Sequence, residues 1–402
     1  HLNVRLKIIV PDNLGDMLSL IEEGKADIAA AGLTITPIRK DVIRFGPVYQ
    51  EVTQQLVYRQ GNQKPKNITA LNHGQLEVVA TSSHVEQLNS HQQDVPDLRW
   101  TENDELDSSG LLELVQLEMI DYTIADSNEI AANQSLFPEL RVAFDISEPQ
   151  ALAWAMPLSE DGSLYNEMAL FFEQMEDSGD LDRLIEKYYG HIRRFDYVDT
   201  RAIHRRILTH LPQYQALFEH AAREFDFDWR FLAAISYQES HWDSKAVSST
   251  GVKGLMMLTK ATARQMKVND REDPSQSIYA GAKYLASIRD RLPERLSDSE
   301  KLWIALASYN IGFGHVEDAR VLTQQDGKNP DLWSDIKIYL ARLSKKEWYS
   351  QTRYGYARGG EPVRYIENIR RYYDILLHQQ QNSNNLEITD DQLKQKEFPA
   401  AL

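Results

Sequence analysis

The sequence contains no cysteine among its 402 residues. Disulfide bonds, thiol nucleophiles and cysteine metal sites are therefore excluded, although this absence does not distinguish a reducing from an oxidising compartment. Basic residues are few relative to acidic ones, because 44 Lys and Arg stand against 60 Asp and Glu and the formal net charge is −16. Binding to phosphates requires an excess of positive charge, so we expect no nucleic-acid partner.

Long hydrophobic runs are also lacking, since none approaches the roughly 20 apolar residues of a membrane span. The sequence opens with "HLNVRLKIIV", which has no Met and begins directly in a strand-like alternation. We therefore expect the natural chain to start earlier, with any signal peptide or anchor before residue 1. A membrane is expected as a partner only through that earlier segment.

The length is sufficient for two domains. Residues 1–192 alternate helix-like stretches with strand-like runs, which is typical of an α/β fold; these runs are "RLKIIV", "LEVVATS", "DYTIADS" and "LRVAFDI". From about residue 203 onward the patterns are helical. We predict an α/β domain over 1–192, a linker over 193–204, a mainly α domain over 205–378 and a polar, partly mobile tail over 379–402.

One predicted helix carries a carboxylate on its apolar face. In "FLAAISYQESHW", Leu232, Ile235 and Glu239 fall at positions i, i+3 and i+7. Desolvation and the negative end of the helix dipole should both raise the pKa of Glu239. A carboxylic acid that stays protonated near neutral pH is a good general acid. A structural Glu bonded to an Arg or a backbone amide is the alternative, because ion pairs perturb pKa values too.

Three further segments contain residues suited to a sugar-binding site. "STGVKGLMMLTKATA" (249–263) places two glycines before a helix start, and glycine allows close backbone approach to a ligand. "ALASYNIGFGHV" (305–316) brings Tyr309 and Asn310 to a glycine-containing turn, and "GYARGGEPVRYIENI" (355–369) adds Glu361 and Tyr365. Taken singly, each segment is a weak signal, because a tyrosine or methionine at helical spacing belongs to the hydrophobic core more often than to a site.

The order of these segments, together with "DPSQSIYAGAKYL", resembles the transglycosylase domain of the soluble lytic transglycosylase superfamily over residues 205–378. The resemblance implies a lysozyme-like fold. It also implies non-hydrolytic cleavage of the bond between N-acetylmuramic acid and N-acetylglucosamine in the glycan strands of peptidoglycan, yielding 1,6-anhydromuramoyl products. No metal or cofactor is implied.

The same resemblance implies roles for individual residues. Glu239 matches the sole catalytic acid/base, and six positions match substrate-binding or neighbouring residues: Ser240, Met256, Met257, Tyr309, Asn310 and Tyr365. Ser240 would hold the N-acetyl group or Glu239, Tyr309 and Asn310 would orient the acid and bind glycan, and Tyr365 would line the cleft. The chain departs from the family pattern at Met257, where many members have Gln, and at Lys260, where many have Pro.

A single carboxyl group is sufficient for this chemistry. Hydrolytic glycosidases need two, whereas here the C6 hydroxyl of the muramic acid would be the nucleophile. Asp243 is the nearest candidate for a second carboxylate, but its position directly after Trp242 indicates a role in closing the helix end. A hydrolytic muramidase and a sensing protein with an inactive enzyme domain are the alternatives.

Residues 22–49, "DYTIADSNEI" and "MEDSGDLDRLIEKYYG" resemble periplasmic solute-binding proteins of the amino-acid-binding type. This resemblance implies two lobes, whose first strand and helix would precede residue 1. Thr34 and Arg39 would bind a ligand carboxylate and Asp126 its amino group, while a surface ion pair with Asp41 is the alternative for Arg39. The expected ligand is an amino acid or a cell-wall stem peptide, and the expected location is the periplasm of a Gram-negative bacterium, attached to the outer membrane.

Overall fold

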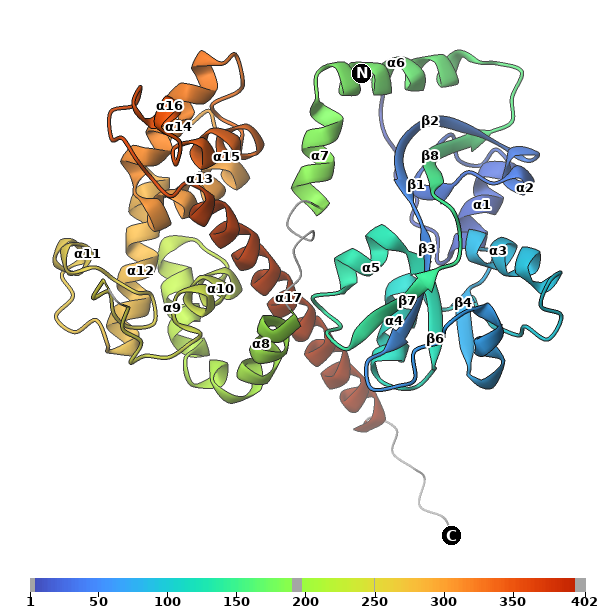
Figure 1. Cartoon of the computed structure of the whole chain (residues 1–402), viewed down its shortest axis with the longest axis horizontal. Coiled ribbons are helices and arrows are strands. Elements are labelled where there is room, and N and C mark those ends of the chain that lie inside the picture. The colour runs from blue at the N-terminus through green and yellow to red at the C-terminus, as the bar shows by residue number, and fades with distance from the viewer. Residues whose placement is uncertain (1–3, 190–196, 249, 395–402) are drawn as a thin grey trace, which may run out of the picture. The chain divides into compact units, whose positions relative to one another are not determined.

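The computed structural model describes residues 4–189, 197–248 and 250–394, and the chain divides into two compact units, His1–Tyr189 and Gly190–Leu402 (Figure 1). The predicted combination of an α/β part followed by a mainly helical part is confirmed. The predicted domain limits remain predictions.

The first unit contains two β-sheets, which define two lobes. Lobe one has a three-stranded antiparallel sheet in the order β1-β8-β2, and lobe two has a five-stranded mixed sheet in the order β5-β4-β6-β3-β7. The strands are β1 (Ala29–Thr34), β2 (Ile43–Val52), β3 (Gln54–Arg59), β4 (Leu76–Val79), β5 (Thr101–Asn103), β6 (Tyr122–Asp126), β7 (Leu140–Asp145) and β8 (Gln150–Pro157). The helices are α1 (Leu14–Glu22), α2 (Pro37–Lys40), η1 (Ile68–His73), α3 (Ser83–Gln92), α4 (Ser108–Gln116), α5 (Ser127–Asn133), α6 (Ser163–Asp177) and α7 (Asp180–Tyr189).

The sheet of lobe two is buried on both faces. Consecutive residues of a strand point to opposite faces, and Leu56 and Val57 accordingly enter two different hydrophobic clusters. Ile124 and Ala125 on the neighbouring β6 divide in the same way. This arrangement fixes the carboxyl ends of β4 and β6, where several polar residues of the candidate site lie.

One sequence prediction about local structure is wrong. Residues 5–10, predicted as a strand, form none and lie exposed, because no described strand pairs with them. Residues 379–394 of the predicted polar tail belong to helix α17 (Gly360–Lys394), and the prediction that part of the tail is mobile stays a prediction. Residues 395–402 of the predicted tail lie outside the described residues. In the predicted linker, residues 193–196 also lie outside them, whereas 197–204 belong to helix α8 (Tyr197–Thr209).

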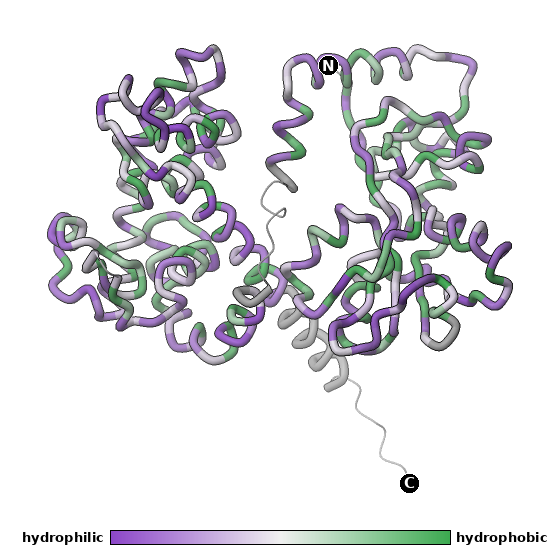
Figure 2. The backbone as a smooth tube through the Cα atoms, in the orientation of Figure 1, coloured by the Kyte–Doolittle hydropathy of each residue, from purple (hydrophilic) through white to green (hydrophobic). Residues whose placement is uncertain are grey.

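The described part of the second unit is built from helices. After α8 they are η3 (Leu211–Gln213), α9 (Gln215–Phe225), α10 (Trp229–Ser240), α11 (Lys260–Met266), α12 (Pro274–Arg289), α13 (Asp298–Ile311), α14 (Phe313–Gln325), α15 (Trp333–Arg342), α16 (Lys346–Tyr349) and α17. The long helix α17 packs against α8, α10, α13 and α15. Hydrophilic and hydrophobic residues are interleaved along the helices (Figure 2), and within the described ranges no helix is long and apolar enough to cross a membrane.

Candidate functional site

Helix α10 presents Glu239 on a face that is otherwise buried. The helix begins after Asp228, whose side chain accepts a hydrogen bond from the Arg230 amide and so caps the first turn. Leu232 and Ile235, which share the face of Glu239, have no exposed surface, as the spacing predicts, while Glu239 itself is half-buried.

The chain turns sharply after Ser240, the last residue of α10. His241 and Trp242 both adopt left-handed backbone conformations, with φ of 52° and 59°. The Trp242 indole folds back and donates a hydrogen bond to the Ala233 carbonyl at 2.9 Å. Glu239 therefore occupies the last turn of a helix whose end is fixed by a buried tryptophan.

The carboxyl group of Glu239 has one tyrosine partner that sequence reasoning did not assign to it. The Tyr365 hydroxyl, in the second turn of α17, donates to Glu239 Oε1 at 2.6 Å. Burial raises the pKa of Glu239 to about 7, and the Tyr365 hydrogen bond opposes part of that rise because it favours the carboxylate. Near neutral pH this group can therefore give up a proton and take one back.

Tyr309 lies near Glu239 but its hydroxyl is used elsewhere. It donates to the Met256 carbonyl at 2.8 Å, and burial together with the charge of Glu239 holds the pKa of Tyr309 well above its usual value. Burial and Glu239 act in the same direction on the pKa of Tyr365. Both phenols therefore remain hydrogen-bond donors at physiological pH. The hydroxyl that donates to Glu239 is thus that of Tyr365, and the orienting role expected for Tyr309 stays a prediction.

The loop before α11 is held against α10 and α12. The hydroxyl of Ser240 lies 3.0 Å from two carbonyls, those of Ser236 and Leu255, so it faces the loop. Met256 is fully buried. The glycine expected to approach a ligand instead approaches protein backbone: a Cβ on Gly254 would lie 1.8 Å from the Arg271 carbonyl oxygen.

The remaining predicted residues of this region are more open. Met257 is half-buried in a left-handed conformation, with φ of 45°, and Asn310 is exposed at the end of α13. Asp243 is exposed and accepts a hydrogen bond from the Lys245 amide in the turn after α10. Glu361 is exposed and lies 3.4 Å from Arg358. Asp243 thus forms a turn, as its position predicted.

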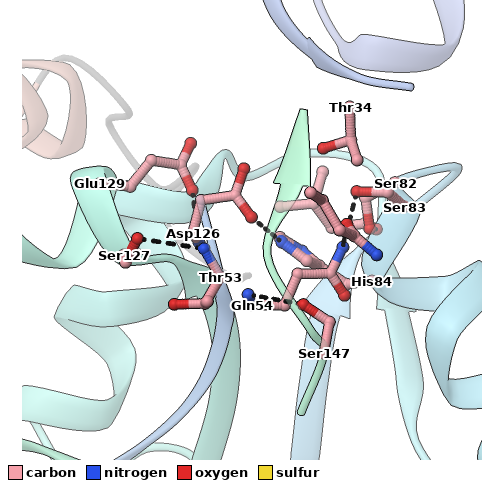
Figure 3. A network of polar contacts seen from close by, with 12 residues as sticks. Thr34, Thr53, Gln54, Ser82, Ser83, His84, Asp126, Ser127, Glu129 and Ser147 are labelled. Atoms are coloured by element: carbon pink, nitrogen blue, oxygen red, sulfur yellow. Dashed lines mark hydrogen bonds and ion pairs between the residues drawn. The ribbon is translucent and has the colours of Figure 1, made fainter. Parts of the chain in front are cut away.

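A second candidate site lies in the first unit, where a cavity of about 440 Å³ is lined by residues of both lobes. Thr34, Arg39 and Asp126, which lie far apart in the sequence, all line it. Figure 3 shows Thr34 above a network of polar side chains that includes Asp126 and His84. The structure therefore brings together the three residues predicted to bind one ligand.

Arg39 is buried and already has partners. Its guanidinium donates to the Thr34 carbonyl at 3.3 Å and to the Thr81 carbonyl at 3.0 Å, and its Nε lies 3.4 Å from a Glu86 carboxylate oxygen. Burial lowers the pKa of Arg39, while Glu86 and Asp126 act in the opposite direction. The acid that Arg39 meets is thus Glu86 of lobe two, which the sequence analysis did not identify. The alternative partner Asp41 is not the one observed.

Asp126 stands at the start of α5 and contacts a buried histidine (Figure 3). His84 Nε2 lies 3.2 Å from Asp126 Oδ1, and the Asp126 amide donates to Glu129 in a capping box. Burial, followed by the charge of Asp126, raises the pKa of Glu129. Within the described residues, His84 Nδ1 is buried without a hydrogen-bond partner. His84 had no signal in the sequence beyond its position after a strand end.

One buried glutamine, Gln54, makes hydrogen bonds at the hinge between the lobes. Its side chain donates to Ser83 and to Gln150, both at 2.9 Å, and its backbone N–H donates to the Ser147 hydroxyl (Figure 3). Gln54 begins β3 and Gln150 begins β8, so these bonds connect the two strands at which the chain crosses between lobes.

Comparison with known proteins gives consistent results for both units. Residues 216–332 match the model of the transglycosylase SLT domain, and residues 1–191 match that of bacterial extracellular solute-binding proteins, family 3. The chain is 48% identical to membrane-bound lytic murein transglycosylase F 1 of Alkalilimnicola ehrlichii, over 94% of this chain and 76% of the relative. It is 46% identical to membrane-bound lytic murein transglycosylase F of Shewanella halifaxensis, over 99% of this chain and 83% of the relative. Among solved structures, an ancestral arginine-binding protein bound to arginine is 20% identical and covers 45% of this chain and 79% of its own, with a TM-score of 0.41.

Proposed function

The chain belongs to the membrane-bound lytic murein transglycosylase F family, and from this premise we propose that it cleaves the glycan strands of peptidoglycan with Glu239 as the acid/base. The chain is a peptidoglycan lytic transglycosylase by family. The observation that supports Glu239 is the hydrogen bond from the Tyr365 hydroxyl to its carboxyl group, whose pKa burial raises to about 7.

The proposed reaction needs one carboxyl group used twice. Protonated Glu239 gives its proton to the oxygen that links N-acetylmuramic acid to N-acetylglucosamine, and the bond from C1 to that oxygen breaks. The C6 hydroxyl of the muramic acid then bonds to C1 and gives its proton to the Glu239 carboxylate. Tyr365 stabilises that carboxylate between the two steps, because it donates its hydrogen bond to the charged form.

A hydrolytic muramidase would need a second carboxylate to activate water. The nearest one in the sequence, Asp243, is exposed and forms a turn. The test is mass spectrometry of the products released from purified sacculi by the full-length protein. We expect 1,6-anhydromuramoyl ends, and reducing ends that carry one additional water would contradict the proposal. Glu239→Gln should reduce the rate by about 10²–10⁴-fold, as loss of general acid–base catalysis does. The product test also separates both enzymes from a sensing protein with an inactive enzyme domain.

The other predicted site residues are proposed to take two different roles. Ser240, Met256 and Tyr309 shape the wall behind Glu239, whereas exposed Asn310 and half-buried Met257 are the candidates for direct glycan contact. We assign catalysis to residues 205–378 and ligand binding to residues 1–192. The location proposed for the enzyme is the periplasm, anchored to the outer membrane.

The first unit is proposed to bind an amino acid or a cell-wall stem peptide and to change the lytic rate. The supporting observation is that Arg39 and Asp126 line one cavity between the lobes, with groups suited to a carboxylate and an ammonium. A ligand held by both lobes favours the arrangement in which both lobes contact it. Such a ligand changes the lytic rate only if it binds the more active and the less active state of the protein with different affinities.

Calorimetry with free amino acids and a stem tetrapeptide, paired with lytic rates, tests this proposal. Arg39→Ala should abolish binding and the change in rate, and Lys40→Ala, an exposed neighbour, is the matched control. Absence of binding, or binding without a change in rate, would contradict the regulatory role and leave the enzyme assignment intact.

A further inference from the structure

Two tyrosines of the second unit are unusually open to solvent. Among the aromatic side chains whose burial the structure describes, only Tyr354 and Tyr356 are exposed, at 53% and 56%. Both lie in the loop of residues 352–359 between α16 and α17, which we call the tyrosine loop. Exposed apolar surface concentrated in one place commonly marks a binding site.

The backbone of the tyrosine loop is held by a buried acid. Asp318 on α14 is only 6% exposed, and its carboxylate accepts hydrogen bonds from the amides of Arg353 at 3.1 Å and Tyr354 at 2.8 Å. The Gly355 amide donates to the Thr352 hydroxyl at 3.2 Å. Burying a carboxylate is costly unless it is well bonded, so this arrangement fixes the loop more firmly than a simple connection requires.

Two glycines allow other parts of the fold to pack directly on this loop. A Cβ added to Gly314 would lie 2.7 Å from the Tyr354 ring, and one added to Gly359 would lie 1.5 Å from the Leu340 carbonyl oxygen. The Tyr354 ring also meets His315 edge-on, with ring centroids 6.1 Å apart. Tyr356 contacts Tyr349 edge-on, with ring centroids 5.7 Å apart. Both tyrosines therefore pack against neighbouring side chains and still leave about half of their surface exposed.

The loop is continuous with the elements that carry the candidate active site. Gly314, on which Tyr354 packs, lies in the first turn of α14, four residues after Asn310 at the end of α13. Helix α17 begins directly after the loop, and its Tyr365 holds Glu239. The tyrosine loop therefore adjoins both the helix that carries Tyr365 and the helix that follows Tyr309 and Asn310.

We propose that Tyr354 and Tyr356 form an accessory platform for a sugar ring of the glycan strand, outside the sugars that flank the cleaved bond. The proposal rests on the proposed function. The face of a sugar ring is lined with C–H groups of partial positive charge, which pack well on the negative face of an aromatic ring. Tyrosine offers this contact at low entropic cost, because only two side-chain torsions must be fixed.

The charge of the loop fits the same polymer. The tyrosine loop contains two cations, Arg353 and Arg358, and Arg358 is already paired with Glu361 at 3.4 Å, which leaves Arg353 as the cation beside Tyr354. The Arg353 guanidinium lies 5.5 Å from the centre of the Tyr354 ring. The lactyl and peptide groups of peptidoglycan provide carboxylates for a cation beside a stacked sugar.

Binding of peptide-free glycan strands tests the platform without interference from catalysis. The full-length Glu239→Gln protein serves as the reference, with long strands and the N-acetylglucosamine trimer as the two probes. Adding Tyr354→Ala and Tyr356→Ala should weaken binding of long strands by roughly tenfold, as loss of a central aromatic contact does, and should leave trimer binding unchanged. Val321→Ala on α14, which removes a residue exposed to 51%, is the matched control.

Two outcomes would overturn the proposal: unchanged affinity for long strands, or an equal loss for both probes, which would place the tyrosines in the catalytic cleft itself. Tyr356→Ala alone, checked by thermal melting, keeps the test valid if loss of the Tyr354 packing impairs folding. If the parent enzyme releases no anhydro products, the proposed function fails. If it does release them and the tyrosine variants bind normally, only the platform fails.

Discussion

Replacing Glu239 by Gln should stabilise the folded protein above neutral pH while it removes catalysis. The amide keeps the size of the side chain and an oxygen that can accept the Tyr365 hydrogen bond, now 2.6 Å long. What it removes is the ionisation of a desolvated group. The difference in unfolding free energy between the variant and the parent therefore measures how much the buried ionisable group destabilises the folded protein.

The magnitude follows from the pKa of Glu239, which burial raises from 4.5 to about 7. Because the folded-state pKa is the higher one, the folded state binds the proton more tightly. The contribution of this proton to the free energy of unfolding is fully present below pH 4.5 and is lost as the pH rises through 7. At about 1.4 kcal/mol per pKa unit, the loss is about 1 kcal/mol at pH 5 and about 3 kcal/mol at pH 8.

The assay is thermal unfolding of the parent and of Glu239→Gln at pH 5 and pH 8, followed at the transition of the second unit, because two units need not unfold together. The advantage of the variant should grow by about 2 kcal/mol between the two pH values, which corresponds to roughly 4–8 °C in Tm for a unit of this size. Asp243→Asn, which changes an exposed carboxylate in the turn after α10, is the control and should show no such growth.

An advantage of Glu239→Gln that is equal at pH 5 and pH 8 would refute the reasoning, because it would mean that Glu239 ionises as easily in the folded protein as in the unfolded chain. A variant less stable than the parent at pH 8 would show that the carboxylate is stabilised by a partner other than Tyr365.

Three further changes test single contacts. Tyr365→Phe should raise the pKa of Glu239, because it removes a bond to the carboxylate, and should move the alkaline limb of the kcat/KM profile up by about one pH unit; an unmoved limb, or one at lower pH, contradicts this. Asp228→Ala should lower the free energy of unfolding by about 1–2 kcal/mol, since α10 loses its cap, and an unchanged denaturation midpoint argues against that role. Glu86→Gln should tighten amino-acid binding several-fold in calorimetry, because a ligand carboxylate no longer competes for Arg39; weaker binding would show that Glu86 assists the ligand.

Local patterns were sufficient to predict the helix of Glu239 and its apolar face. Period-three and period-four spacing reports which residues share a helix face, and Leu232 and Ile235 are indeed fully buried. The partner of Glu239 could not be found in this way. Tyr365 lies 126 positions later, and only the packing of α17 against α10 brings its hydroxyl to the carboxylate.

The first unit shows the same division between local and tertiary information. The resemblance placed Thr34, Arg39 and Asp126 together, and the structure has them on one cavity. It did not predict that Arg39 would contact Glu86 across the lobes, because that contact depends on how two sheets face each other. The strand predicted over residues 5–10 failed for a related reason: alternation indicates a strand only where another strand can pair with it.

Helix α17 is long enough to link the environment of Glu239 with helix α8. Tyr365 lies near its beginning, whereas Gln379 lies 3.4 Å from His204 of α8 and Gln380 accepts a hydrogen bond from Arg230 in the first turn of α10. At 1.5 Å per residue, Tyr365 and Gln379 are about 21 Å apart along the axis. A helix resists compression but can tilt, and a tilt of about 5° around the far end would move the near end by about 2 Å over that length. That displacement is enough to break the bond to Glu239, since hydrogen bonds weaken steeply with distance and angle. A displacement of α8, the first described helix of the second unit, would thus tilt α17 and change the length of the hydrogen bond between Tyr365 and Glu239.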